Sequence, residues 1–190
     1  PGQTEGSAFL HKVLLIDHTG VNCGNCPKAV ENLRNLESKT EWGPYYNEVT
    51  CHAGSFANGD PARSNAADIL NQVQGNQGYI DGYPTININF FKKASSYNYG
   101  VIASVLQGVV KKDGADVGIS LSVEKGSSKV VCSALIKAAV SNEYKVNAWL
   151  LENNIYSPNQ SGGFKDYHYY YNHALRNTSE TFSYGDIPGK

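Results

Sequence analysis

The sequence has no excess charge of either sign and no long apolar run. Sixteen basic and 17 acidic residues leave a formal net charge of −1, so neither a nucleic-acid-binding surface nor an acidic tail is expected. The apolar runs are far shorter than the ~20 residues that a membrane-spanning helix needs. Methionine is absent even at the first position, which favours a mature or trimmed chain. With 41% apolar residues in 190, the composition is that of a globular protein with one large or two small domains.

Cysteine is also scarce, because four in 190 residues are too few for a disulfide scaffold. Cys23 and Cys26 form a C-x-x-C, but no second Cys or His pair follows at the spacing of a zinc site. His168 and His173 are too far apart, and have too little support from cysteine or carboxylate, to indicate a metal site. We therefore expect no metal and no cofactor, other than a redox-active disulfide between Cys23 and Cys26.

The C-x-x-C lies between a predicted strand and a predicted helix. The apolar residues 13–16 indicate a strand over about 12–18 that is buried on both faces, as in a parallel sheet. A turn at Gly20 follows, and helical spacing predicts a helix over about 24–39. The unpaired N–H groups at the start of a helix favour a thiolate. This layout predicts that Cys23 is the exposed and reactive cysteine and that Cys26 is shielded.

Asp17 lies six residues before Cys23, at the end of the predicted strand. One interpretation is that it is buried under the disulfide and takes the proton of Cys26 during exchange. The other is that its side chain caps a turn.

A second stretch bears on this choice: Gly82, Tyr83, Pro84 and Thr85 lead into a strand with alternating apolar residues. Together with Asp17 and the C-x-x-C, this order of segments resembles the thioredoxin fold. The resemblance implies a cis peptide bond before Pro84. It also implies that Tyr83, Pro84 and Thr85 border a groove for an extended substrate peptide.

His52 ends a second predicted strand, over residues 48–52, which we expect to lie parallel to the first. The same sheet edge would then hold His52 and the C-x-x-C. His52 either tunes the disulfide as a neighbour of the site or is only hydrogen-bonded structure. Residues from about 53 to 78, with a helix over 62–74, are interpreted as an insertion.

The pattern changes after a predicted helix over 99–112. Residues 117–123 alternate, and the segments 130–140 and 144–151 continue as strands. The prediction is an α/β thioredoxin-like domain over 1–112, with a flexible arm over 1–9, followed by a small antiparallel β-sandwich-like domain over 113–190. Cys51 and Cys132 lie in predicted strands, so we expect both to be buried, unpaired and inert. The tyrosine-rich run 167–171 is either a stacking or partner surface or the packing of a long loop.

Several segments also resemble the outer-membrane-protein-28-related family of Bacteroidetes lipoproteins. The similarity includes the residues around Asp17 and the C-x-x-C and continues through four further segments: 52–57, 82–85, 151–160 and 167–176. The resemblance implies a thioredoxin-like domain, a C-terminal β-domain and export to the periplasm, outer membrane or cell surface. The family usually carries further strands after Arg176, so the β-domain is predicted to be shortened here. No signal-peptide pattern opens the sequence, and membrane association is expected only through a lipid anchor outside it.

Two functions follow as expectations. In the first, the protein is a thiol–disulfide oxidoreductase acting on protein thiols or disulfides of the envelope. Cys23 attacks, Cys26 resolves the mixed disulfide, and Asp17 relays a proton. In the second, the protein is a non-catalytic surface lipoprotein that binds a partner through its β-domain, and the C-x-x-C is a structural disulfide.

Overall fold

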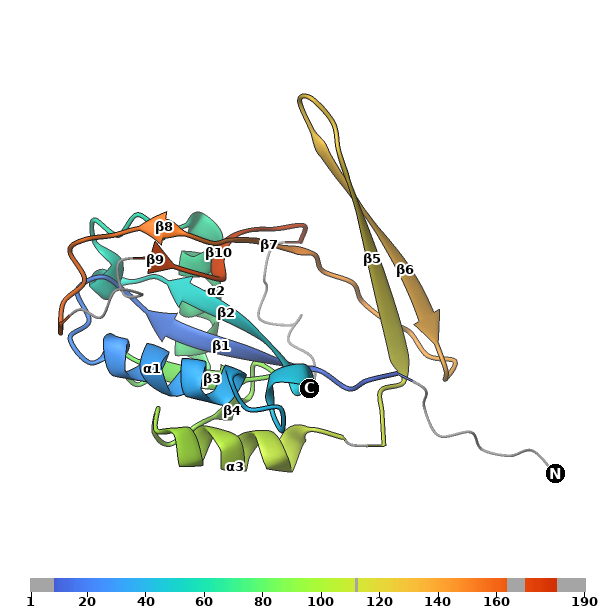
Figure 1. The fold of residues 1–190 in the computed structure, drawn as a ribbon, viewed down its shortest axis with the longest axis horizontal. Coiled ribbons are helices and arrows are strands. Elements are labelled where there is room, and N and C mark those ends of the chain that lie inside the picture. The colour runs from blue at the N-terminus through green and yellow to red at the C-terminus, as the bar shows by residue number, and fades with distance from the viewer. Residues whose placement is uncertain (1–8, 112, 164–169, 181–190) are drawn as a thin grey trace. The chain divides into compact units, whose positions relative to one another are not determined.

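The computed structural model describes residues 9–111, 113–163 and 170–180. The chain divides into a larger unit, residues 13–109 and 146–190, and a smaller unit, residues 1–12 and 110–145 (Figure 1). The larger unit is therefore interrupted in sequence by most of the smaller one.

The larger unit is built on a mixed sheet in the order β4-β3-β1-β2-β10-β7. β1 is central: it pairs in parallel with β2 and antiparallel with β3. β10 runs parallel to the other edge of β2. The strands of this sheet are β1 (Val13–Thr19), β2 (Tyr46–His52), β3 (Thr85–Ile88), β4 (Lys92–Lys93), β7 (Trp149–Glu152) and β10 (Ala174–Thr178).

The predicted parallel pair near the start of the chain is confirmed, and β1 is buried over nearly its whole length. Its alternation decides what each face carries, because successive side chains of a strand point to opposite sides. Ile16 and His18 contact α2 (Asn65–Asn76), whereas Asp17 and Thr19 face α1 (Cys26–Glu37). The face of the sheet that α1 covers therefore carries polar side chains on its central strand.

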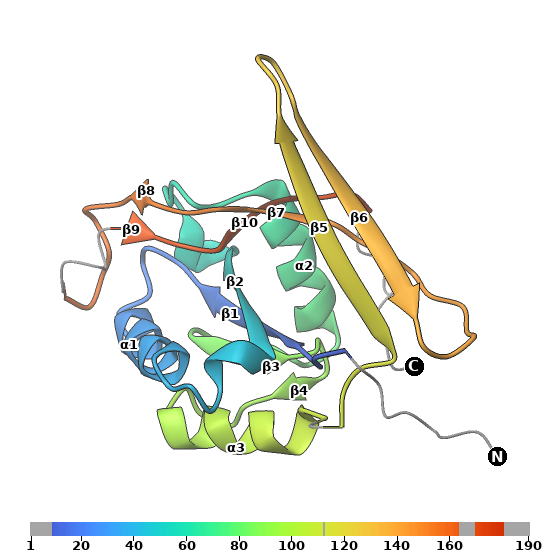
Figure 2. The same cartoon turned by 45° about the vertical axis from the view of Figure 1, so that its right-hand side comes forward.

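Helices cover both faces of this sheet (Figures 1 and 2). α2 packs on β2 and β10, while α1 lies on the opposite face and contacts α3 (Tyr99–Val109), which also contacts β3. Short 3-10 turns precede and follow β2, at Gly43–Tyr45 and Ser55–Ala57. The Ser64 hydroxyl accepts a hydrogen bond from Ala67 N and so caps α2.

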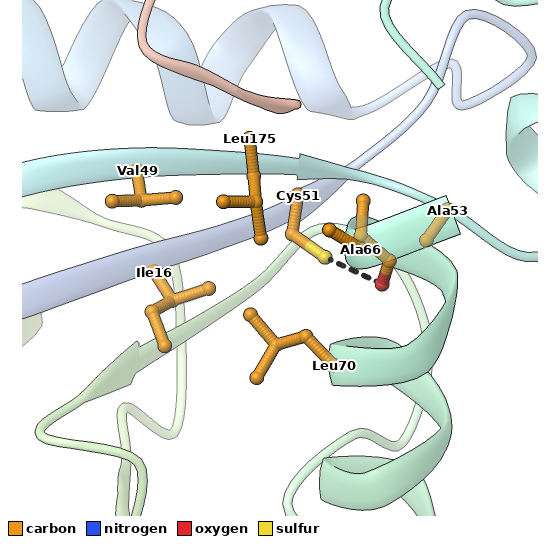
Figure 3. Packing of buried hydrophobic residues seen from close by; sticks show 8 residues of the cluster. Ile16, Val49, Cys51, Ala53, Ala66, Leu70 and Leu175 are labelled. Atoms are coloured by element: carbon orange, nitrogen blue, oxygen red, sulfur yellow. Dashed lines mark hydrogen bonds between the residues drawn. The ribbon is translucent and has the colours of Figure 1, made fainter. Parts of the chain in front are cut away.

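The apolar core on the α2 side contains Ile16, Val49, Leu70 and Leu175 around the Cys51 thiol (Figure 3). Cys51 is fully buried and its Sγ lies 3.2 Å from the carbonyl oxygen of Ala67. Burial raises the pKa of this thiol, and Asp68 and Asp17 add to the effect. The expectation that Cys51 is buried and unpaired is confirmed.

The observed division of the chain differs from a boundary between residues 112 and 113. Residues 146–180 return to the larger unit, where Ala174 of β10 is the register partner of Thr50 of β2. Without β10, β2 would present an unpaired edge, which is unfavourable for a strand whose last four residues are buried. The insertion expected over 53–78 is a loop and α2, which cover the back of the same sheet.

The smaller unit is a hairpin of β5 (Val117–Lys125) and β6 (Val130–Ala138), and Phe9 forms an isolated bridge with Ala115. The expected β-sandwich is therefore not found in the described residues of this unit, which hold this two-stranded sheet. Segment 144–148 forms no strand, and residues 149–152 belong to the larger sheet. Cys132 is exposed rather than buried, as is every other residue of β6.

In the described residues no helix is both long enough and apolar enough to cross a bilayer.

Candidate functional site: a buried disulfide above an acidic residue

Cys23 and Cys26 form a disulfide at the start of α1. Cys26 is the first residue of the helix, Asn25 is the N-cap and Pro27 lies in the first turn, where a missing N–H costs no hydrogen bond. The turn before the helix is tight: Cys23 N donates to Gly20 O over 3.0 Å. Gly20 itself packs against the carbonyl of Phe56, and any side chain at this position would overlap that carbonyl.

Both cysteines of the disulfide are buried, which corrects the expectation that Cys23 is exposed. Cys23 is 2% exposed and Cys26 is 1% exposed. Part of the cover is residues 157–162, here named the strap. Gln160 Nε2 donates to Cys23 O over 3.1 Å, and Ser161 N donates to Val21 O over 2.8 Å. The position at a helix start was predictable, but a covering segment that lies more than 130 residues away in sequence was not.

Asp17 lies on the face of β1 that α1 covers, and its register partner on β2 is Thr50. It is fully buried, and neither carboxylate oxygen has a hydrogen-bond partner among the described residues. Burial raises its pKa well above the usual range, and the Glu48 carboxylate adds to the effect. Asp17 is thus not the cap of a turn.

A cavity of about 200 Å³ lies between α1 and this face of the sheet. Cys26 and Asp17 both line it, so the shielded cysteine and the buried acid border the same cavity. The other residues that line it are Thr19, Pro27, Val30, Arg34, Glu37, Glu48, Thr50, His52, Asn153, Gln160, Tyr170, Tyr171, Asn172 and His173.

Glu48 is a second acid of this cavity that the sequence analysis did not single out. Burial and the Glu37 carboxylate raise its pKa to about 7, against a smaller opposite effect of Arg34. The sequence did carry a signal for Glu48. It lies two residues before Thr50 on the same strand, and residues two apart on a strand point to the same face of the sheet.

His52 lies beside the C-x-x-C turn but reaches it through Asp60. His52 Nδ1 lies 2.8 Å from Asp60 Oδ2, and the same oxygen accepts a hydrogen bond from Val21 N over 2.8 Å. Burial alone would raise the pKa of Asp60, but the hydrogen bonds and charge of His52 and the main-chain donors lower it. On its other side, the His52 ring packs against Tyr171 at a centroid distance of 4.4 Å. His52 is therefore part of the support of the turn.

Tyr83 and Pro84 lie on the loop before β3, Thr85 is the first residue of that strand, and the Tyr83–Pro84 peptide bond is cis, as predicted. They line a groove of about 360 Å³ together with Asp81, Gly82, Ile86 and residues 93–97. The Tyr83 hydroxyl lies 2.6 Å from Asn71 Oδ1 and 3.0 Å from Ala53 O, and its ring stacks on Phe56. These contacts hold the loop against α2.

Of the tyrosine-rich run, residues 167–169, including His168, lie outside the described residues. Tyr170 and Tyr171 form the short strand β9, paired with β8 (Ile155–Tyr156). Tyr170 is 48% exposed, whereas Tyr171 is buried and its hydroxyl donates to Gln160 Oε1 over 2.7 Å. For Tyr171, the interpretation as packing of a loop therefore applies. Among the described residues, no group of three or more His, Cys, Asp or Glu side chains could hold a metal ion.

Two solved structures are similar to the chain. One is HBP35 of Porphyromonas gingivalis, with a TM-score of 0.74 and 19% sequence identity over 97% of this chain. The chain spans 60% of that protein's chain. The other is a protein of Agrobacterium tumefaciens, with a TM-score of 0.54 and 14% identity, covering 91% of this chain and 73% of that one. At these identities the similarity is one of fold. No family model and no curated protein matches the chain.

Proposed function

We propose that the larger unit is a thioredoxin-like domain of an exported protein and that it exchanges disulfides through Cys23 and Cys26. The observation that carries the proposal is the position of Asp17. This buried acid, which has no hydrogen-bond partner among the described residues, lines the same cavity as Cys26, at the start of a helix that can stabilise the Cys23 thiolate. The family resemblance to the outer-membrane-protein-28-related lipoproteins supports export, and an oxidising compartment suits the disulfide.

The exchange runs in two steps. In the reduced protein, the Cys23 thiolate attacks one sulfur of a substrate disulfide and expels the other as a thiolate, which leaves a mixed disulfide on Cys23. Asp17 then takes the proton of Cys26, and the Cys26 thiolate attacks the Cys23 sulfur. The Cys23–Cys26 bond forms and the second substrate sulfur leaves as a thiolate. Two electrons pass to the substrate, and a thiol reductant restores the protein dithiol.

The raised pKa of Asp17 suits this role, because a carboxylate that binds a proton more tightly is a better acceptor for the proton of a thiol. The groove beside Pro84, which Tyr83 and Thr85 also line, supports binding of an extended peptide. Protein thiols and disulfides of the envelope are the proposed partners.

A second function is favoured by the burial of the disulfide. With Cys23 only 2% exposed, the bond can serve as a structural staple, and the protein then binds a partner through its exposed hairpin. In that hairpin Ile119, Leu121 and Leu135 are 64%, 72% and 74% exposed, which is typical of an interaction surface.

One assay separates the two functions. Wild-type protein and Cys23→Ser are compared in the reduction of insulin disulfides by dithiothreitol. Exchange predicts that the wild type accelerates the reduction and that Cys23→Ser does not. Equal rates, together with a reduction potential below about −300 mV, are the result expected of a structural bond.

A further inference from the structure

We infer that the strap, residues 157–162, is a gate that closes over the Cys23–Cys26 disulfide and that must open before the bond can react. This inference concerns the regulation of the proposed exchange site and rests on that proposed function for its biological meaning. The opening itself is a property of the fold that can be measured without any substrate.

The strap is held on the C-x-x-C turn at three main-chain positions. Gln160 Nε2 donates to Cys23 O over 3.1 Å and lies 3.4 Å from Gly20 O, and Ser161 N donates to Val21 O over 2.8 Å. These carbonyls belong to the turn that carries Cys23, which is only 2% exposed, so in the closed state a partner sulfur has little access to this cysteine.

Gly162 gives the strap its closest approach. It has a φ of +93°, which favours glycine, and a Cβ at this position would overlap the carbonyl of Gly24. The backbone of the strap therefore lies directly on Gly24, the first of the two residues between the cysteines. Gly163 also has a left-handed φ, of +101°, but a Cβ there would meet nothing within 4 Å.

Tyr171 connects the strap to the residues that support the turn. Its hydroxyl donates to Gln160 Oε1 over 2.7 Å, and its ring packs on His52, which is bonded to Asp60. Asp60 in turn accepts a hydrogen bond from Val21 N. Val21 is thus held through its N–H by Asp60 and through its carbonyl by Ser161, so closing the strap and ordering the turn are coupled.

The closed strap is anchored by few side chains, which is why it can open locally. Ser157 and Gln160 are buried, whereas Pro158 and Asn159 between them are exposed. A segment held by a few hydrogen bonds and little apolar contact opens with a smaller free energy than the whole domain. A disulfide that reacts only from the open state is reduced at a rate set by the population of that state.

Gly162→Ala and Gly163→Ala form a matched pair that tests the gate. Both place a methyl group on a left-handed residue, so both carry similar backbone strain, but only the first collides with the turn. The rate of reduction of the disulfide by a phosphine reductant is measured for the oxidised wild type and both variants, below the onset of global unfolding. We expect Gly162→Ala to be reduced at least about tenfold faster than Gly163→Ala, the factor for losing roughly one buried hydrogen bond.

Gln160→Ala provides the second variant, and Ser64→Ala is its control for general destabilisation, since it removes the cap of α2 far from the strap in sequence. We expect faster reduction in Gln160→Ala only, with a rate that does not change in low urea, as local opening requires. Equal rates in Gly162→Ala and Gly163→Ala, or in Gln160→Ala and Ser64→Ala, would overturn the gate.

The insulin assay distinguishes failure of the gate from failure of the exchange function. If the strap variants are reduced faster but no form accelerates insulin reduction, the gate holds and exchange fails. If the wild type accelerates insulin reduction and the strap variants equal the controls in the phosphine reaction, exchange holds and the gate fails.

Discussion

The side chain of Gln160 donates a hydrogen bond to the main-chain carbonyl of Cys23 across 137 residues of sequence. It places a segment from the end of the chain on the turn that carries the disulfide. The surroundings of the C-x-x-C are thus formed by two parts of the chain. The N-terminal part supplies the sulfurs and the acid beneath them, and the C-terminal part covers them.

Asp17→Asn should slow the second step of exchange. Asparagine keeps the size of the side chain but cannot take the Cys26 proton, so we expect the mixed disulfide on Cys23 to resolve about 10²-fold more slowly near pH 7. The measurement is a single turnover with a fluorescent peptide disulfide over a range of pH. Asp113→Asn is the control, because Asp113 is exposed and lies in the smaller unit. If Asp17→Asn resolves as fast as the control, Asp17 is not the proton acceptor.

The stability of the protein should depend on pH through groups of opposite effect, of which Glu48 and His18 are two. The pKa of Glu48 is raised to about 7, so the folded state holds its proton between about pH 4.5 and 7 and stability falls as pH rises through that range. The pKa of His18 is lowered to about 4 by burial, against weaker effects of its hydrogen bonds to Gln74 and Asn71. The unfolded state therefore takes up that proton first, and stability falls as pH drops from 6.5 to 4.

Glu48→Gln removes the first of these contributions and leaves the second. Between pH 4.5 and 6.5 the free energy of unfolding of the variant should therefore rise more steeply with pH than that of the wild type. The difference in slope should reach up to about 1.4 kcal/mol per pH unit, the value for one bound proton. Urea unfolding at several pH values measures it, and Glu124→Gln, at an exposed position of β5, is the control. Parallel pH profiles for Glu48→Gln and the wild type would show that Glu48 titrates normally.

The two free cysteines should differ in reactivity and in cost of replacement. Cys132 is exposed and should react with an aromatic disulfide reagent in the native protein, whereas Cys51, buried at 0% exposure, should react only on unfolding. Cys51→Ala should cost about 1 kcal/mol of stability, and Cys132→Ala should stay within about 0.5 kcal/mol of the wild type. Reaction of two thiols per native chain would contradict the core packing around Cys51.

Local patterns were sufficient to predict the first half of the site. The apolar run before Asp17, the helix after Cys26 and the proline before β3 are each encoded in a few neighbouring residues. The return of β10 to the sheet was not predictable in this way. It depends on pairing between Ala174 and Thr50, and neither segment alone shows which edge it joins.

The cover of the disulfide was missed for a related reason. Gln160 has no pattern around it that marks a covering residue. Its hydrogen bond to Cys23 depends on β8, β9 and β10 belonging to the larger unit. Asp60 is similar, because a turn residue gives no sign that its carboxylate will join His52 to Val21.

The most direct test of the account is to trap the intermediate of exchange. Reduced Cys26→Ser and Cys23→Ser proteins, each with Cys132→Ala, are incubated with an envelope extract and analysed on non-reducing gels. Cys26→Ser should accumulate mixed disulfides on Cys23 that thiol reductants release, and Cys23→Ser should form none. Trapped species from neither variant, or in equal amounts from both, would contradict the assignment of Cys23 as the attacking residue and of the site as one of exchange.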